Sequence, residues 1–515
     1  MNYLSGKLTS ILVSVTLLSL VALVRAEDIY IAQAAQGSDT GAAAANAHSA
    51  AWFNAAGNWG TGAGKISAGD TVHLVGTIST ALTVQASGAS GSVITILFES
   101  GAKLSAAHWT TSGALNINSK SFLVIDGGTN GLIECTDNGT TKTYQVDTNG
   151  ILGAGLDHVT IQNLTITNMY DRTAFSTTDG HRMGIPINIA GSYLTVQNCT
   201  LSGGDTMIAI SYTTGSQSNW TVTGNTISNC NHGITMGCAQ VNAFVTDVTI
   251  SNNLIDHLDC WGPISGNHLD GIIIFNEASD SSGSITNLYV YGNTIGPNVG
   301  TINTAAVFLD TAGPQLVNAR VYNNLFTYVS PYGWANGCVV GGATGLLIAN
   351  NTFIGYRTRG SGSATGLGSK PGGTNIIHEN NLYYSVGCVV NFGGSSSFPA
   401  VFVSEYNIYY DLPGGTGAFY FPNYAAGNWS LWQGAGYDAT GHSTRSQPTL
   451  DANYVPTSAD TVAKGKGTNL SAYFTTDKNG NPRPATGAWD IGAFISGAPL
   501  SAVAPSTART TITVR

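Results

Sequence analysis

Charged side chains are scarce in this chain. Asp, Glu, Lys and Arg together make up 9% of its 515 residues, against the ~25% that is usual in soluble domains. Surface helices, coiled coils and charged disordered tails all depend on such residues. Glycine, in contrast, contributes 65 of the 515 residues, which is nearly twice its usual share of ~7%. The composition therefore excludes a mainly helical protein.

Cysteine and basic residues are also few. The seven cysteines are too sparse for a disulfide scaffold, and no pair has the spacing of a zinc finger. We therefore expect buried free thiols, with a single bridge as the alternative. The 19 Lys and Arg residues are outnumbered by 28 Asp and Glu residues and form no basic stripe. Because phosphate binding needs such a stripe, we expect no nucleic-acid partner.

Only one long apolar run occurs, at residues 8–24. Lys7 precedes it and Val24-Arg25-Ala26 ends it, a pattern typical of a secretory signal peptide. We predict removal of residues 1–26, so that a mature chain begins at Glu27 and is secreted, extracellular or periplasmic, with no membrane contact afterwards. An uncleaved membrane anchor is the alternative. The mature chain would carry 17 basic and 28 acidic residues, a net charge of −11.

A short phrase recurs along the mature chain: an alternating strand that ends in Asn, followed by a second hydrophobic step. Val, Ile, Thr and Tyr alternate with polar residues around the Asn, which predicts strands rather than helices. Successive phrases lie 26 to 40 residues apart, as in a solenoid. Their centres are Asn163, Asn198, Asn225, Asn253, Asn293, Asn324, Asn351, Asn381 and Asn407. Coils of two or three short strands should therefore stack as a parallel β-helix, with rungs ~4.8 Å apart.

The repeated Asn and a second strand in each coil predict how the coils align. We expect each Asn to adopt a left-handed turn conformation and to bond through its amide to the Asn above and below. We expect the branched residues of the second strands to point inward. The aligned segments are Thr206–Ile208, His232–Ile234, Asp270–Ile272, Ala305–Val307, Gly337–Val339 and Gly387–Val389. In this register Cys338 and Cys388 lie two rungs apart, too far for a disulfide.

The two ends of the mature chain differ from the repeats. Residues 29–106, which contain GSDTG and AGDTVHL, indicate a first short helix and opening coils that cap the apolar core. A closing motif, D-x-x-G-x-P-R-P followed by W-D-I-G-A, lies at Asp477–Ala493. Together with the Asn phrases, these motifs resemble the exported right-handed parallel β-helix proteins of the pectate-lyase-like superfamily.

This resemblance covers nearly all of the mature chain. It implies an all-β fold, a right-handed parallel β-helix over residues 27–494 with an N-terminal capping segment. The composition of residues 495–515 separately predicts a flexible tail. The superfamily includes lyases, hydrolases, epimerases, esterases and non-enzymatic surface proteins, so the resemblance leaves the activity open.

Titratable residues gather in two enlarged coils and on the coils between them. The candidate catalytic residues are Asp179, His181, Arg182, Asp205, His232, His268 and Asp270. In the predicted register Thr206, His232 and Asp270 lie on successive rungs, with Asp205 beside the first. A His beside a carboxylate is held in one tautomer and has a raised pKa, which suits proton transfer near neutral pH. The alternative is that these residues only cap turns.

Three phrases resemble part of the polygalacturonase pattern of the same superfamily: Thr-Thr-Asp179-Gly, Gly-Asp205-Thr-Met-Ile-Ala-Ile and Asn-His232-Gly-Ile-Thr-Met-Gly. Thr206 stands where that pattern has a second Asp, and no Arg-Ile-Lys follows. The resemblance implies an inverting hydrolase, in which Asp179, Asp205 and Asp270 would supply an acid and a base ~6.5–9.5 Å apart.

β-Elimination from a uronate needs a different set of groups. The uronate carboxylate must be neutralised by a cation or an Arg, and a base must lie over the C5 hydrogen. Arg182 with His181, or Arg182 with His232, could supply the neutraliser and the base. His268 and Asp270 would face them.

Two kinds of additional contact are expected at this region. Asp179, Asp205 and Asp270 could alternatively hold Ca²⁺, which favours clustered oxygen ligands, and we expect no organic cofactor. Three aromatic residues in expected turns or loops could stack on sugar rings, with coverage of the core as the alternative. They are Tyr170, Trp261 and Trp334.

These observations favour a secreted, monomeric enzyme that degrades a polysaccharide. We expect first a lyase that cleaves an acidic, uronate-containing glycan by β-elimination. The alternatives are an inverting glycoside hydrolase and a non-catalytic surface protein that binds glycan.

Overall fold

The structure is a computed structural model. It describes residues 26–172, 182–211, 214–238, 241–258, 269–276, 282–298, 304–311, 315–328, 335–355, 365–367, 373–393, 397–412, 414 and 416–498. The expected signal peptide and C-terminal tail therefore lie almost entirely outside the described residues. Within those residues, no helix combines the length and the apolar character that a membrane crossing requires.

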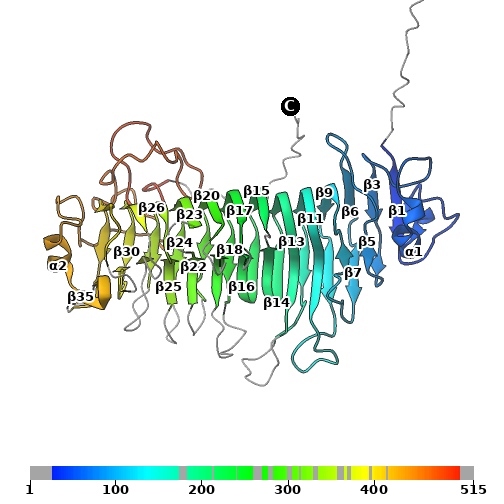
Figure 1. The fold of residues 1–515 in the computed structure, drawn as a ribbon, viewed down its shortest axis with the longest axis horizontal. Helices are drawn as coiled ribbons and strands as arrows, with labels where there is room; N and C mark the ends of the chain where they lie inside the picture. The colour runs from blue at the N-terminus through cyan, green and yellow to red at the C-terminus, as the bar shows by residue number, and fades with distance from the viewer. Residues whose placement is uncertain are drawn as a thin grey trace, which may run out of the picture.

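The described chain winds into a long stack of β-strands, in which each strand pairs in parallel with the equivalent strand of the next coil (Figure 1). The strands form three faces, which we name A, B and C in the order in which the chain passes through them. Face A precedes the repeated Asn, face B follows it, and face C closes the coil. The predicted all-β parallel β-helix is confirmed.

Face A comprises β1 (Asp28–Ala32), β3 (Thr71–Leu74), β6 (Ile94–Phe98), β9 (Ser121–Asp126), β11 (Thr148–Gln162), β13 (Gly184–Gln197), β15 (Gly215–Thr223), β17 (Ala243–Ser251), β20 (Ser284–Tyr291), β23 (Leu316–Tyr322), β26 (Thr344–Ala349), β29 (Thr374–Glu379) and β32 (Phe402–Glu405).

Face B comprises β4 (Thr77–Ile78), β7 (Lys103–Ala106), β10 (Leu132–Cys135), β12 (Thr165–Thr167), β14 (Thr200–Ser211), β16 (Thr226–Cys238), β18 (Leu254–Asp256), β21 (Thr294–Ile295), β24 (Leu325–Thr327), β27 (Thr352–Ile354), β30 (Leu382–Tyr384) and β33 (Ile408–Tyr410).

Face C comprises β5 (Leu82–Thr83), β8 (Leu115–Asn116), β19 (Asp270–Asn276), β22 (Thr304–Asp310), β25 (Ala335–Val340), β28 (Thr365–Leu367), β31 (Val390–Asn391) and β34 (Phe419–Phe421), with the first halves of β11 and β13 and the second halves of β14 and β16.

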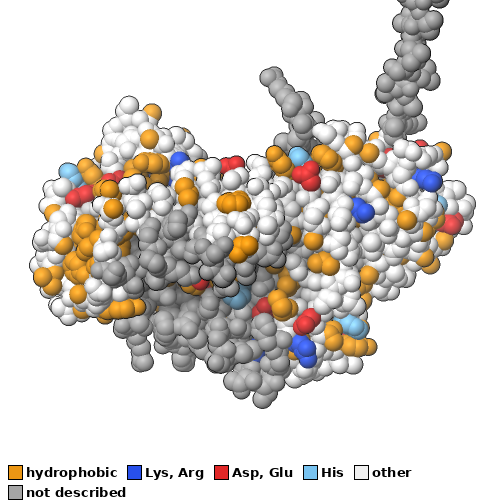
Figure 2. Space-filling model, viewed as in Figure 1, with side chains coloured by type: hydrophobic (Ala, Val, Ile, Leu, Met, Phe, Trp, Pro, Cys, Tyr) orange, Lys and Arg blue, Asp and Glu red, His pale blue; other side chains and the backbone are white. Residues whose placement is uncertain are grey.

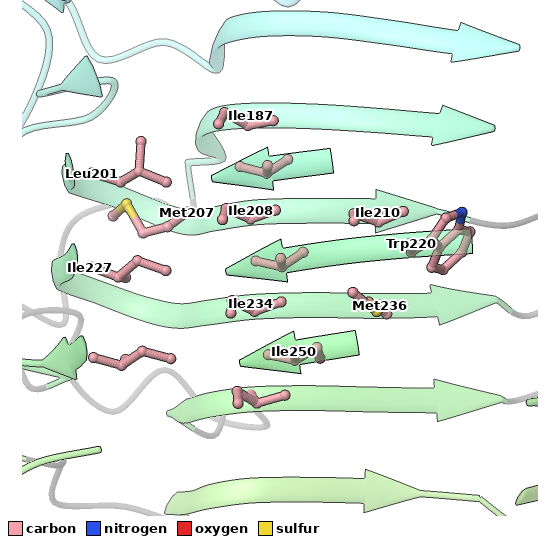
Figure 3. Packing of buried hydrophobic residues seen from close by; sticks show 14 of the residues in the cluster. Ile187, Leu201, Met207, Ile208, Ile210, Trp220, Ile227, Ile234, Met236 and Ile250 are labelled. Atoms are coloured by element: carbon pink, nitrogen blue, oxygen red, sulfur yellow. The ribbon is translucent and has the colours of Figure 1, made fainter. Parts of the chain in front are cut away.

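Equivalent branched residues stack in columns inside the three faces. Figure 3 shows Ile187, Ile208 and Ile234 one above another from successive strands, and all three are fully buried. Leu201 and Ile227 form a neighbouring column. Burial of each such side chain contributes about 1.5–3 kcal/mol, so the repeated alternation in the sequence becomes one continuous core.

A ladder of buried asparagines follows the corner between faces A and B. Each side-chain Nδ2 donates to the Oδ1 of the next Asn at 3.0–3.2 Å. Its members are Asn225, Asn253, Asn293, Asn324, Asn351, Asn381 and Asn407. The ladder satisfies polar groups that would otherwise be costly to bury.

Two details of the expected ladder were wrong. The left-handed conformation belongs to the residue before the ladder position, such as Asn252 (φ 56°) and Asn323 (φ 53°), because that residue makes the turn itself. Asn163 and Asn198 occupy this turn position with φ of 58° and 55°. Strand pairing aligns Cys199, not Asn198, with Asn225, so Asn163 and Asn198 lie outside the ladder.

The expected register of the second strands holds for four coils and then shifts. Thr206 pairs with His232, His232 with Asp270, and Asp270 with Ala305, as predicted. In the next coil Val307 pairs with Cys338, not with Val339. The reason is that the fully buried Cys338 fills the inward position as a small hydrophobe.

The cysteines agree with the expectation of free thiols wherever they can be assessed. Four are free and buried: Cys135, Cys199, Cys338 and Cys388. Cys230 is also buried. Burial raises the pKa of Cys199 and Cys338 to about 12. Strand β28 pairs on one side with β25, which carries Cys338, and on the other side with β31, which begins two residues after Cys388. Cys338 and Cys388 therefore lie two rungs apart. The Cys238 side chain and Cys260 lie outside the described residues.

The two ends are closed by different segments. At the N-terminal end, strand β2 (His48–Ser49) leads into helix α1 (Ala50–Asn54), which buries Phe53 against Trp59, with ring centroids 4.9 Å apart. At the far end, β35 (Ala425–Gly427) and helix α2 (Trp429–Gly434) bury Trp432. The predicted N-terminal capping segment is confirmed.

The closing motif covers a side of the molecule and not its end. Leu470, Phe474 and Trp489 pack on Leu347 and Ile377, which point outward from face A. Figure 1 shows this orange-to-red segment above β23 and β26. Face A is therefore covered in its C-terminal half by the chain's own last segment.

Candidate active site

The corner between faces B and C differs from coil to coil. Strands β14 and β16 run through this corner without interruption. On one side of them, β12 and β13 are separated by the 16 residues 168–183, and on the other, β18 and β19 are separated by the 13 residues 257–269. The two loop-free coils therefore form a floor between two long connections, and the described candidate residues lie on it or at its edge.

Three of the candidate residues come together at this corner. Register places Thr206, His232 and Asp270 on adjacent strands, with Asp205 directly before Thr206. His232 Nε2 lies 3.7 Å from Asp270 Oδ2. This distance is longer than a hydrogen bond, but it is within the range of an ion pair when the imidazole is protonated.

Asn231 links the first two rungs of the cluster. Its Nδ2 donates to Asp205 Oδ1 at 3.2 Å and contacts His232 Nδ1 at 3.1 Å. The Asn231 amide therefore connects Asp205 to the imidazole and fixes the orientation of the ring. Within the described part of the chain, the buried Asn231 Oδ1 has no hydrogen-bond partner.

The members of the cluster differ in their access to solvent. Asp205 is 3% exposed and Asp270 is fully buried, whereas the His232 side chain keeps 18% of its surface exposed. Asp270 Oδ1 accepts the backbone N–H of Ala305 at 3.0 Å. The imidazole is thus the accessible group, and the two carboxylates lie behind and beside it.

Arg182 enters the same corner from the preceding coil. It is exposed and lies two residues before Gly184, with which β13 begins. Gly204 has no Cβ, but one placed there would lie only 2.6 Å from the carbonyl oxygen of Gly184. The start of β13 is therefore in close contact with the residue before Asp205. The structure therefore brings an exposed guanidinium-bearing residue onto the rung next to Asp205.

The expected role of Tyr170 in sugar stacking was wrong. Its side chain is completely buried and packs with Leu269, the residue before Asp270. A ring in this position supports the corner from beneath and cannot reach a ligand. The other expected members Asp179, His181, Trp261, Trp334 and His268 lie outside the described residues.

Asn231 is the site residue that was missed. The sequence signal was its place directly before His232, because the same register that aligns His232 with Thr206 sets Asn231 beside Asp205. An Asn in this chain is easily assigned to a turn, and only the contact with both neighbours distinguishes it.

A Ca²⁺ site does not form from the described residues. They contain no group of three His, Cys, Asp or Glu side chains close enough to hold a metal ion. Asp205 and Asp270 lie two strand spacings apart, roughly 10 Å along the stack, with His232 between them. Ca²⁺ requires oxygen ligands at ~2.3–2.6 Å, so these two carboxylates alone do not fit it.

Comparisons with known proteins found similar folds without sequence relatives. No family model matches the chain, and no curated protein matches its sequence. The pectate lyase Pel9A matches 91% of this chain and 96% of its own, with 15% identity and a TM-score of 0.41. The PL6 family alginate lyase AlyGC matches over 85% of this chain and 57% of its own, with 15% identity and a TM-score of 0.49.

A third structure, XylC in complex with xylose, matches over 91% of this chain and 98% of its own. Its identity is 9% and its TM-score 0.48. Similarities of this size carry no information on the reaction of this chain, whose β-helix is established by its own strand pairing.

Proposed function

We propose that this protein is a polysaccharide lyase that cleaves an acidic, uronate-containing glycan by β-elimination. The observation that carries the proposal is the accessible His232 imidazole beside buried Asp270, on a loop-free floor with exposed Arg182 at its edge. This set combines a proton-transfer group with a cation for the substrate carboxylate.

In the proposed reaction the imidazole of His232 takes the C5 proton of the uronate. The C4–O bond breaks, a C4=C5 double bond forms, and the departing glycosidic oxygen takes up a proton from water, while the imidazolium returns the C5 proton to solvent. Arg182 pairs with the uronate carboxylate and stabilises the negative charge that develops at C5. Asp270 stabilises the imidazolium that results, and Asn231 and Asp205 hold the ring in place. His181 and His268 remain alternative proton-transfer groups.

Inverting hydrolysis is the second candidate. Two strand spacings, about 10 Å, separate the backbones of Asp205 and Asp270, near the ~6.5–9.5 Å between carboxyl groups that inversion requires. That reaction needs both carboxyl groups, or one of them and Asp179, to face the sugar and a water molecule. The burial of Asp205 and Asp270 favours elimination over hydrolysis.

Incubation with polygalacturonate, alginate and glucuronate-containing polymers tests the proposal. A lyase produces unsaturated ends that absorb in the ultraviolet, whereas a hydrolase produces reducing ends without this absorbance. Binding with neither product would establish a non-catalytic glycan-binding protein instead. A parallel assay with a chelator tests Ca²⁺: loss of activity that added Ca²⁺ restores would require ligands beyond the described residues, such as Asp179.

We also infer that the protein is exported and acts as a monomer. The apolar run before Glu27 supports export. The two closed ends support a monomer, because the terminal coils are where unpaired strand edges could associate. The N-terminal sequence of the secreted protein and its molar mass in solution test these two inferences.

A further inference from the structure

A cavity lies on face A, away from the B–C corner, in the half of this face that the closing segment leaves uncovered. Its volume is about 560 Å³, within the ~300–1,000 Å³ typical of ligand pockets. Strands β9, β11, β13 and β15 form its floor, and the turn that contains Ser90 and Gly91 forms one wall. It takes no part in the proposed elimination.

One edge of the cavity is a column of aromatic rings. Phe122 stacks on His158 with centroids 4.8 Å apart and planes inclined by 17°, and His158 stacks on Tyr193 at 4.2 Å and 9°. His158 Nδ1 also contacts Asp157 Oδ2 at 3.0 Å. Tyr193 is 46% exposed. The column therefore presents its ring edges to solvent, and Tyr193 ends it.

The fold does not require aromatic residues at this position. Phe122, His158 and Tyr193 have φ of 55°, 55° and 53°, a left-handed conformation that is unfavourable for bulky side chains. Strand pairing aligns them with residues that adopt it more easily in the later coils. These residues are Asn219, Asp247, Asn287, Asn318, Gly345 and Asn375, all with positive φ. The three rings thus occupy a strained turn position where Asn would suffice.

The column also stops where a ligand could continue it. Asn219 follows Tyr193 on the next rung, and its short side chain leaves the next ring position unfilled, although it still lines the cavity. The floor beside the column carries Thr160, Thr195 and Thr221 in register on successive strands, ~4.8 Å apart. Among the residues that the structure describes, no Asp, Glu, Lys or Arg lines the cavity.

We propose that this cavity is a second, non-catalytic carbohydrate site that binds an extended, uncharged glycan along the β-helix axis. A sugar ring stacks on the outer face of Tyr193 above Asn219, and the threonine hydroxyls bond to sugar hydroxyls. The absence of charged lining residues matches an uncharged ligand, in contrast to the uronate expected at the B–C corner. From Val93 to Asn219 the lining of the cavity covers five successive coils, roughly 19 Å at the usual strand spacing.

Affinity electrophoresis of the full-length protein in gels containing xylan, galactomannan or soluble β-glucan tests the proposal, with polygalacturonate and alginate as charged comparisons. The decisive variant replaces all three rings: Phe122→Asn, His158→Asn and Tyr193→Asn. Asn occupies the same turn in later coils, so the fold should be retained and the midpoint of thermal unfolding should not fall. We expect at least about tenfold weaker binding of the neutral glycan. Asp247→Asn, at the same turn position outside the cavity, is the matched control and should bind as the unmodified protein does.

A second variant keeps the column intact. Thr195→Arg fills the cavity from the floor and should also abolish retention of the neutral glycan. Unchanged binding by both variants, or no retention of any neutral glycan by the unmodified protein, would overturn the proposal. Loss of binding only to the charged polymers would overturn the assignment to an uncharged ligand. Release of unsaturated ends from uronate polymers should be unaffected in the three-ring variant, so the two proposals fail separately.

Discussion

Two regions of this β-helix place a histidine close to a buried carboxylate, and they differ in how fully the carboxylate is enclosed. At the far end, Asp438 is fully buried and accepts hydrogen bonds from five side chains. The donors are Ser404, Asn407, Tyr409, Trp432 and Ser443. His378 is fully buried beside them and contacts Ser404 Oγ at 3.0 Å. This cluster is complete in itself.

At the B–C corner, the same residue types are left open. The His232 ring reaches solvent and lies 3.7 Å from Asp270. It contacts the Asn231 amide, which also donates to Asp205. The comparison teaches that residue type alone does not identify a reactive site. A closed network stabilises the end of a solenoid, whereas an open one can exchange protons with a ligand.

The largest contrast is expected from removal of the open histidine. His232→Ala should lower the rate of formation of unsaturated ends by about 10²–10⁴-fold, the usual contribution of a proton-transfer group, with little change in the midpoint of thermal unfolding. Initial rates on the best uronate polymer measure the effect. The exposed His442 offers a matched control, since His442→Ala should retain full activity. Equal activity of both variants would remove His232 from the mechanism.

Removal of the closed carboxylate should act on stability. Asp438→Ala leaves five buried donors without their acceptor and should lower the free energy of unfolding by about 3–5 kcal/mol. Urea unfolding measures this change, and hydrogen exchange should show it first in the last coils, because solenoid stability is local. Activity per folded molecule should be unchanged, since the candidate site at His232 is many coils away from Asp438. A variant as stable as the original protein would show that the network contributes no net stability.

The closed histidine should make stability depend on pH. Burial lowers the pKa of His378 to about 4, below the ~6.5 of an unfolded His. The unfolded chain therefore binds a proton that the folded one excludes, so this contribution is present above pH ~6.5 and is lost as the pH falls toward 4, by about 3 kcal/mol.

The comparison of the original protein with His378→Gln isolates this contribution. Glu379, whose pKa burial raises to about 7, has the opposite sign, but it is present in both proteins. The unfolding free energy of the Gln variant should fall less steeply between pH 6.5 and 4. Parallel curves for the two proteins would contradict the assignment.

The smallest effect is expected from the shared amide. Asn231→Ala removes the contacts to Asp205 and to His232 Nδ1 and frees the imidazole ring to rotate. We expect about a tenfold loss in turnover, about 1.4 kcal/mol, with a shifted pH–rate profile. Asn231→Gln offers a longer amide and should restore part of the rate. A loss of stability without any shift of the pH profile would indicate a purely structural role for Asn231.

Much of the fold could be predicted because each coil repeats the same local demands. Alternation marks the strands, and the Asn phrase marks the corner between faces A and B. Two of the errors were shifts by a single residue: Asn198 was assigned to the ladder in place of Cys199, and Val339 was aligned in place of Cys338. In both cases a buried Cys filled a position that the phrase reserved for another residue type, so pattern matching slipped by one.

The candidate site was harder to predict than the fold. Tyr170 was expected in contact with sugar, but its side chain is completely buried and packs with Leu269. The aromatic column at Tyr193 was not predicted, because its members are 35 or 36 residues apart and resemble ordinary strand residues. Only the stacking of coils makes them neighbours.

By itself, the sequence determined that strands of two-residue period recur every 26 to 40 residues, and the stacking of such repeats as coils buries their branched residues in one core. The tertiary structure alone decided that β14 and β16 pass through the corner at His232 without a loop, and that the last segment returns to cover face A instead of the end. The physical reason is that strand period and turn preference are local properties. Contacts between coils, in contrast, depend on the lengths of all intervening connections.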